Sequence, residues 1–202
     1  MRLLFFLFLS SVMAPAGQVL ISTVAKVKNH VVTSREVEIH NHLDKVLGFL
    51  GEMTPVDDPV EKVIREWLLY YEASSFYNTG LASSQIQKSM GDAQKKLSGH
   101  KDWQRLGVTQ SELKQMVERR LQAERLYKFK KKASVLPVSD AEVESEYSQN
   151  RIRYGNLSFE EVRTQIRNNK IQQNLDVRMN HWFEVLERKY KVQRFAGFKA
   201  AK

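Results

Sequence analysis

The stretch VAKVKNHVVTSREVE, residues 24–38, decides how the fold begins. Valines alternate with lysines before Asn29-His30 and two further valines follow, a pattern typical of two short strands joined by a tight turn. Thr33 offers a side-chain hydroxyl to a helix, and Glu36 stands three residues later, which is the spacing of a capping box. The stretch therefore predicts a small β-hairpin that leads directly into a helix ending at Gly51.

The chain beyond this stretch has the pattern of a mainly α protein. It contains only four prolines, and apolar residues recur at helical spacing in its long segments. The pattern predicts further helices from Pro59, capped by Asp58, over residues 82–98, over residues 110–133, over residues 140–149, and over about thirty residues after Ser158. Residues 191–195 alternate like a strand. Because a lone strand is unstable, we expect it to pair with the hairpin near Val24.

The first sixteen residues have the three-part pattern of a secretory signal peptide. Arg2 precedes an apolar run over residues 3–9, and Ala14 and Ala16 occupy the −3 and −1 positions of a cleavage site. A transmembrane anchor needs about 20 consecutive apolar residues, and this run ends too early. We therefore expect cleavage after Ala16, with residues 17–202 forming one exported domain.

Composition narrows the classes of partner. The chain has no cysteine, so an exported form cannot use disulfides and must rely on packing. Its formal net charge of +9 favours acidic partners such as an anionic membrane surface or nucleic acid. Export makes nucleic acid the weaker of these two expectations.

No pattern of catalytic or metal-binding residues stands out. His40 and His42 are two apart on a helix, so they face different directions, and no acidic residue or cysteine completes a ligand set at useful spacing. We interpret them as residues of a solvated helix surface. Phosphate-binding loops and Ser-His-Asp signatures are also lacking. The sequence therefore predicts a protein that is not an enzyme and that needs no metal or cofactor.

The helix that starts at Pro59 is apolar most of the way round. One stripe contains Trp67 and Tyr71, whereas Tyr70 and the aromatic residues at its end lie off that stripe. Such a helix is central in a core or exposes an apolar surface. Trp67 and Tyr71 suit the core as well as the surface. We take five aromatic residues as candidates for a substrate-binding surface: Trp67, Tyr70, Tyr71, Phe76 and Tyr77.

A basic run interleaved with aromatic residues follows in the helix over residues 110–133. Its lysines are Lys128, Lys130, Lys131 and Lys132. They could complement the dipole of a helix that ends there, or they could contact an anionic surface, or nucleic acid through added base stacking. The sequence leaves these interpretations open.

The order of these parts resembles the SurA family of periplasmic chaperones. The resemblance covers nearly all of residues 19–195, and it rests on residues 24–38, on Val63-Ile64 with Leu68-Leu69 and Ala73, on Leu106-Gly107-Val108-Thr109, on residues 138–143 with Tyr147, and on residues 157–162. It implies a helical chaperone domain in the periplasm, which holds unfolded outer-membrane or secreted polypeptides without ATP.

One departure from that family concerns its parvulin-type prolyl-isomerase domains. They are inserted between the segment that resembles residues 138–143 and the last long helix. A domain needs at least roughly 50 residues, which the interval 150–157 cannot hold. The resemblance therefore implies a chaperone module without isomerase activity. The alternative is a basic envelope protein that binds an anionic membrane surface, nucleic acid or one folded partner as a scaffold.

Overall fold

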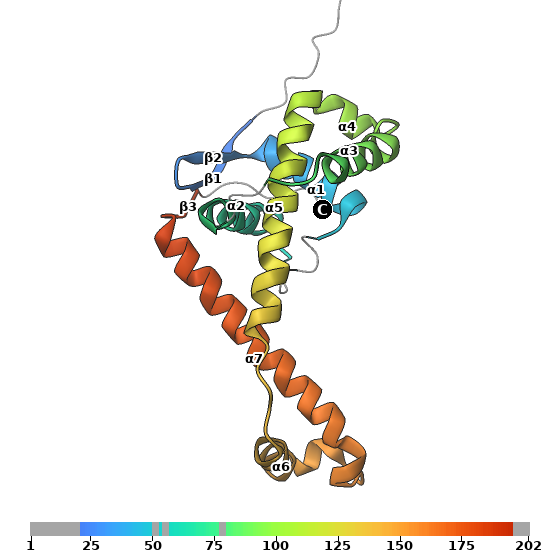
Figure 1. The fold of residues 1–202 in the computed structure, drawn as a ribbon, viewed down its shortest axis with the longest axis vertical. Coiled ribbons are helices and arrows are strands. Elements are labelled where there is room, and N and C mark those ends of the chain that lie inside the picture. The colour runs from blue at the N-terminus through green and yellow to red at the C-terminus, as the bar shows by residue number, and fades with distance from the viewer. Residues whose placement is uncertain (1–20, 50–52, 54–56, 77–79, 196–202) are drawn as a thin grey trace, which may run out of the picture.

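The computed structural model describes residues 21–49, 53, 57–76 and 80–195 (Figure 1). The expected signal peptide over residues 1–16, the predicted helix end at Gly51 and the candidate Tyr77 lie outside the described residues.

A small antiparallel sheet opens and closes the described chain. Strands β1 (Thr23–Val27) and β2 (His30–Thr33) form the hairpin, in which Lys26 pairs with Val31. Strand β3 (Gln193–Arg194) pairs with the other edge of β1, so that the strand order is β2-β1-β3. Lys28, in the turn, has a φ of 55°, the left-handed conformation common in tight turns. Both the hairpin and its pairing with the closing strand are confirmed.

The remaining elements are helical, which confirms the mainly α fold. In chain order they are α1 (Ser34–Leu47), α2 (Pro59–Phe76), α3 (Ser83–Leu97), α4 (Lys101–Arg105), α5 (Gln110–Ser134), α6 (Asp140–Gln149), the 3-10 turn η2 (Arg151–Tyr154) and α7 (Phe159–Lys189). Helix α1 ends at Leu47, before the predicted end, and Gly48 follows with a φ of 71°. The short helix α4 was not predicted.

Side-chain caps set the helix starts, including the predicted caps at Thr33 and Asp58. The Thr33 and Thr109 hydroxyls accept from the backbone N–H of Glu36 and Glu112, and Asp58 accepts from that of Val60. Complete capping boxes begin α6, at Ser139 with Glu142, and α7, at Ser158 with Glu161. Local hydrogen bonding therefore explains where these helices begin.

The described residues form a body with a long extension (Figure 1). In the body, one hydrophobic core joins the sheet to α2, α5 and α7, and a second joins α1, α3 and α5. Helices α5 and α7 lead away from the body, and α6 packs on the first half of α7 at the far end around Val143 and Val162. None of the described helices combines the length and hydropathy needed to cross a bilayer.

Candidate functional site

Trp67 lies in the core of the body rather than on a surface. Its side chain is buried, and its indole N–H donates to Glu36 Oε1 at 2.8 Å. The His30 ring stacks on it with centroids 3.7 Å apart, and the Arg119 guanidinium carbon lies 4.0 Å from its ring centroid. The prediction that Trp67 belongs to an exposed binding surface is therefore wrong, because hairpin and helix residues cover the indole.

Tyr70 and Tyr71 lie at the margin of the same core. Both are half-buried, and the ring centroid of Tyr71 lies 5.5 Å from that of Trp67 and 5.6 Å from that of Tyr190. The Lys28 ammonium lies 5.0 Å from the Tyr71 ring centroid, and burial raises the pKa of the Tyr71 hydroxyl. These two tyrosines extend the aromatic core towards Tyr190 and β1, and they do not line the cavity described next.

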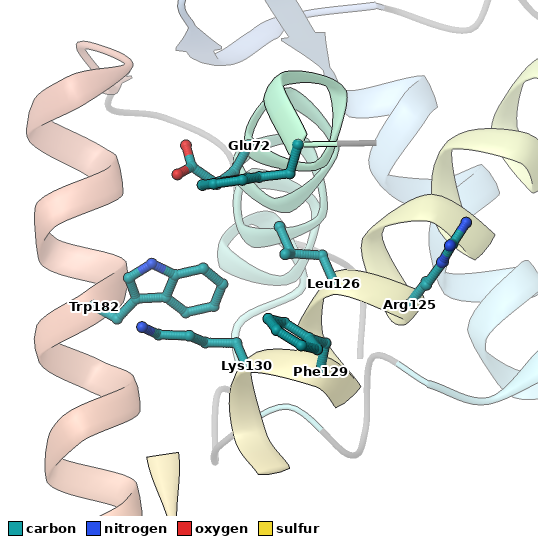
Figure 2. A pocket seen from close by; sticks show the side chains of 7 residues that line it. Glu72, Arg125, Leu126, Phe129, Lys130 and Trp182 are labelled. Carbon is teal, nitrogen blue, oxygen red and sulfur yellow. The ribbon is translucent and has the colours of Figure 1, made fainter. Parts of the chain in front are cut away.

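Phe76, at the last position of α2, is 67% exposed and lines a cavity of about 630 Å³. We call this cavity the α2–α5–α7 groove. Figure 2 shows Trp182 of α7 on one side, facing Phe129 and Lys130 of α5, with Leu126 between α2 and α5. The lining residues are Glu72, Phe76, Arg125, Leu126, Phe129, Lys130 and Trp182.

Helical spacing explains why α5 contributes so much of this lining. Leu126 and Lys130 are four residues apart, as are Arg125 and Phe129, so all four share one side of the helix. Leu126 is buried and forms part of the floor, whereas Phe129 is 64% exposed. The groove therefore presents exposed aromatic carbon above a buried aliphatic floor.

Glu72, the acidic residue among the described lining of the groove, is paired within the fold. Glu72 Oε2 accepts from Lys189 Nζ and from the Tyr190 hydroxyl, each at 2.7 Å. The hydrogen bond to Glu72 raises the pKa of Lys189, while burial, followed by that same carboxylate, raises the pKa of Tyr190. The Glu72 carboxylate points towards α7 in Figure 2 and forms part of the groove wall.

A second cavity, of about 510 Å³, adjoins the first and shares Lys130 and Trp182 with it. We call it the second lobe. Val177 and Val185 of α7 are exposed along it. Its lining residues are Lys130, Ala133, Ser134, Val177, Arg178, His181, Trp182 and Val185. An apolar band therefore continues from α2 along the crossing of α5 and α7.

The four candidate lysines do not act as one patch. Lys130 lies 5.3 Å from the Trp182 ring centroid and belongs to the groove. Lys128 pairs with Glu124 one turn earlier on α5. Lys131 and Lys132 stand in the last turn of α5, where positive charge complements the helix dipole. Only Lys130 among them lines either lobe.

A buried ionic cluster, which the sequence did not predict, occupies the body. His40 is buried, so the interpretation of this residue as part of a solvated surface is wrong. Its Nε2 lies 2.7 Å from an Arg119 nitrogen, and its Nδ1 lies 3.3 Å from Glu66 Oε2. His42 faces another way and is half-buried beside Trp103. The sequence held one signal for His40: it stands three residues before the buried Leu43, on the core side of α1.

Arg119 and Arg120 of α5 hold the carboxylates of this cluster. Arg119 contacts Glu66 Oε1 at 3.0 Å and Glu36 Oε1 at 3.2 Å. Arg120 pairs with Asp44 and donates to the carbonyl of Gly48, which secures the end of α1. The cluster thus ties α1, α2 and α5 together.

The charges around Glu66 change its acidity. Burial alone raises the pKa of its carboxyl, but His40, Arg119 and Arg120 outweigh that effect and lower it to about 2. Glu66 is therefore ionised at neutral pH, and its charge is matched inside the fold. In the described part of the chain, no three His, Asp or Glu side chains are placed to share a metal ion.

Comparison with protein-family models finds no matching family, and comparison with curated proteins finds no similar sequence.

Proposed function

We propose that this protein is an ATP-independent holdase, which captures apolar segments of unfolded polypeptides in the α2–α5–α7 groove and so keeps them from aggregating. The observation that carries the proposal is the exposure of Phe76 and Phe129, at 67% and 64%, around one cavity that also contains Trp182. Large apolar side chains exposed together mark interaction surfaces in soluble proteins.

The strength of such binding suits reversible capture. Fully burying a Phe side chain contributes about 1.5–3 kcal/mol, and association costs several kcal/mol in lost motion. One groove with two exposed Phe side chains therefore binds a single segment weakly. A client is held when several of its apolar segments bind, each in the groove of a different chaperone molecule. Release then needs no nucleotide, because a client leaves when its apolar segments bury each other in its own fold.

The class of client is an expectation from the sequence. The signal-peptide pattern over residues 1–16 and the resemblance to SurA chaperones favour unfolded outer-membrane or secreted polypeptides in the periplasm. The interval 150–157 supports a holding role without isomerase activity, since it is too short for another domain.

An aggregation assay tests the proposal. Light scattering follows an unfolded outer-membrane protein after dilution, alone and with the full chain. The wild type should suppress scattering, and the double change Phe76→Ala with Phe129→Ala should weaken suppression. The matched control is Phe195→Ala, which removes an exposed Phe outside both lobes. Equal suppression by the double variant and the wild type would contradict a role for the groove.

A salt series in the same assay separates the alternative function. Apolar capture should change little between low and high salt, whereas binding through surface lysines should weaken steeply. Changing Lys128, Lys131 and Lys132 to Gln should leave high-salt capture intact. If these changes abolish binding at every salt concentration while the Phe changes do nothing, the basic-envelope-protein interpretation replaces the holdase.

A further inference from the structure

We infer that the groove and its second lobe select polypeptide segments in which a carboxylate stands beside apolar side chains. This inference rests on the proposed function and adds a substrate class to it. Lys130 and Trp182 carry the inference, because they are the two described residues that line both cavities.

The charge of the lining is mainly positive. The acidic side chain of the first cavity, Glu72, is occupied by Lys189 and Tyr190. The second lobe contains Arg178 and His181 together with Lys130, and none of its described lining residues is acidic. Arg125 lines the first cavity alone, and its side chain points away from Trp182 in Figure 2, so Lys130 is the cation where the two cavities adjoin.

Lys130 is placed to meet a carboxylate without leaving the groove. Its ammonium lies 5.3 Å from the Trp182 ring centroid, a cation–π contact that is weak at an exposed site. A carboxylate on the solvent side of that ammonium adds a charge-assisted hydrogen bond while the lysine stem stays on the indole. Apolar side chains of the same segment then lie on either side of this point, against Phe129 in one cavity and Val185 in the other.

The shape of the site favours a polypeptide over a single anion. Exposed apolar side chains come from three helices, at Phe76 of α2, Phe129 of α5, and Val177 and Val185 of α7. The cavities measure about 630 and 510 Å³ and adjoin at Lys130. A chain segment supplies several apolar side chains in sequence and can fill both cavities at once.

Fluorescence anisotropy with three labelled peptides tests this selection. The peptides carry the same apolar residues, and the positions between them are Glu, Gln or Lys. With the full chain at low salt, the Glu peptide should bind up to about fivefold more tightly than the Gln peptide, the largest factor that one exposed ion pair supports. The Lys peptide should bind most weakly. Lys130→Gln should bring the Glu and Gln peptides together, and Lys130→Glu should reverse the order.

The control is Lys132→Glu, the same charge change two residues along α5 at a position that lines neither lobe. It should keep the preference for the Glu peptide. Circular dichroism melting of each variant shows that the fold persists, and Lys130→Gln serves as the milder change if Lys130→Glu unfolds the chain.

The outcomes separate this inference from the proposed function. If all three peptides bind alike while client aggregation is still suppressed, the selection for carboxylates is overturned and the holdase proposal stands. If no peptide binds and aggregation proceeds, both are overturned. If a long-chain fatty acid binds in a Lys130-dependent way and displaces the peptides at lower concentration than they displace one another, the occupant is a small amphiphile and the polypeptide inference is overturned.

Discussion

The body and the groove distribute polar and apolar side chains in opposite ways. In the body, Glu66, His40 and Arg120 are almost completely buried. In the groove, Phe76 and Phe129 are mostly exposed. Each arrangement reverses the usual preference of its residues for surface or interior. The difference separates a region organised for structure from the region that we propose binds a partner.

Charge matching explains why the body can hold buried ionised side chains. A buried carboxylate is costly unless cations and hydrogen-bond donors surround it, and Glu66 has Arg119, Arg120 and His40 around it. By contrast, the described residues leave the Phe76 and Phe129 rings of the groove mostly exposed. A ligand that buried Phe129 and Phe76 would remove their apolar surface from water. Its effect on the groove would correspond to that of Arg119 on Glu66, whose buried charge it pairs.

Helix α5 belongs to both regions. Its middle carries Arg119 and Arg120, and its last third carries Phe129 and Lys130. The helix is held in the body by ion pairs and packing, while its continuation supports one wall of the groove. Changes in the two halves of α5 should therefore have separable effects.

The largest effect is expected from Arg119→Met. This change leaves Glu36 and Glu66 buried without their shared guanidinium, so the free energy of unfolding should fall by about 3–5 kcal/mol. Urea unfolding measures it. The control is Arg105→Met, which breaks an exposed pair with Glu38 and should cost less than about 1 kcal/mol. Equal costs for the two variants would break the comparison between the regions.

Acid should weaken the body through Glu66. Its pKa is lowered from 4.5 to about 2 on folding, so the unfolded state binds more protons between these values. The stabilisation is therefore complete above pH 4.5 and is lost as the pH falls towards 2, a difference of about 3 kcal/mol. Urea unfolding at a series of pH values should show a smaller acid slope for Glu66→Gln than for the wild type. Identical slopes would mean that Glu66 does not titrate as its surroundings require.

Truncation before β3 should have an intermediate effect on the body. Removing residues 193–202 breaks the pairing of β3 with β1 and the ion pairs of Arg194 with Glu61 and Glu187. The expected loss is about 2 kcal/mol, seen as a lower melting temperature. Removal of residues 196–202 alone is the control and leaves β3 in place. An unchanged melting temperature after the longer truncation would show that β3 adds no stability.

The smallest effect on stability is expected in the groove. Phe129→Ala should change the free energy of unfolding by no more than about 0.5 kcal/mol, because its ring is exposed. Leu126→Ala, one turn away on the buried floor, should cost about 2–5 kcal/mol. Differential scanning calorimetry compares the two. A large loss in Phe129→Ala would show that the ring is a structural part of the fold.

Local signals in the sequence explain why the fold could be predicted correctly. Ser139 with Glu142 and Ser158 with Glu161 act within one helical turn, so their spacing predicts where α6 and α7 begin. The strand pairing of Lys26 with Gln193 is not local, yet it could be predicted because an isolated strand needs a partner.

The sites depend on contacts that spacing does not contain. His40 looked like a surface residue because its partner Arg119 is 79 positions away along the chain. Trp67 was correctly placed on the apolar stripe of α2, but the stripe could not show that His30 and Arg119 would cover it. Phe76 and Lys130 were predicted as parts of two different surfaces. The packing of α2 against α5 brings them to one groove, which is why spacing along one helix could not show it.

The central position of β1 also has a consequence for the order of folding. Its edge partner β3 is among the last described residues to be synthesised, so the sheet cannot be completed until almost all of the described chain has left the ribosome. At roughly 5–20 residues per second, synthesis of this length lasts many seconds. During that interval one edge of the hairpin stays unpaired. Because closing so long a loop is slow, the pairing of β3 with β1 is a late step in folding.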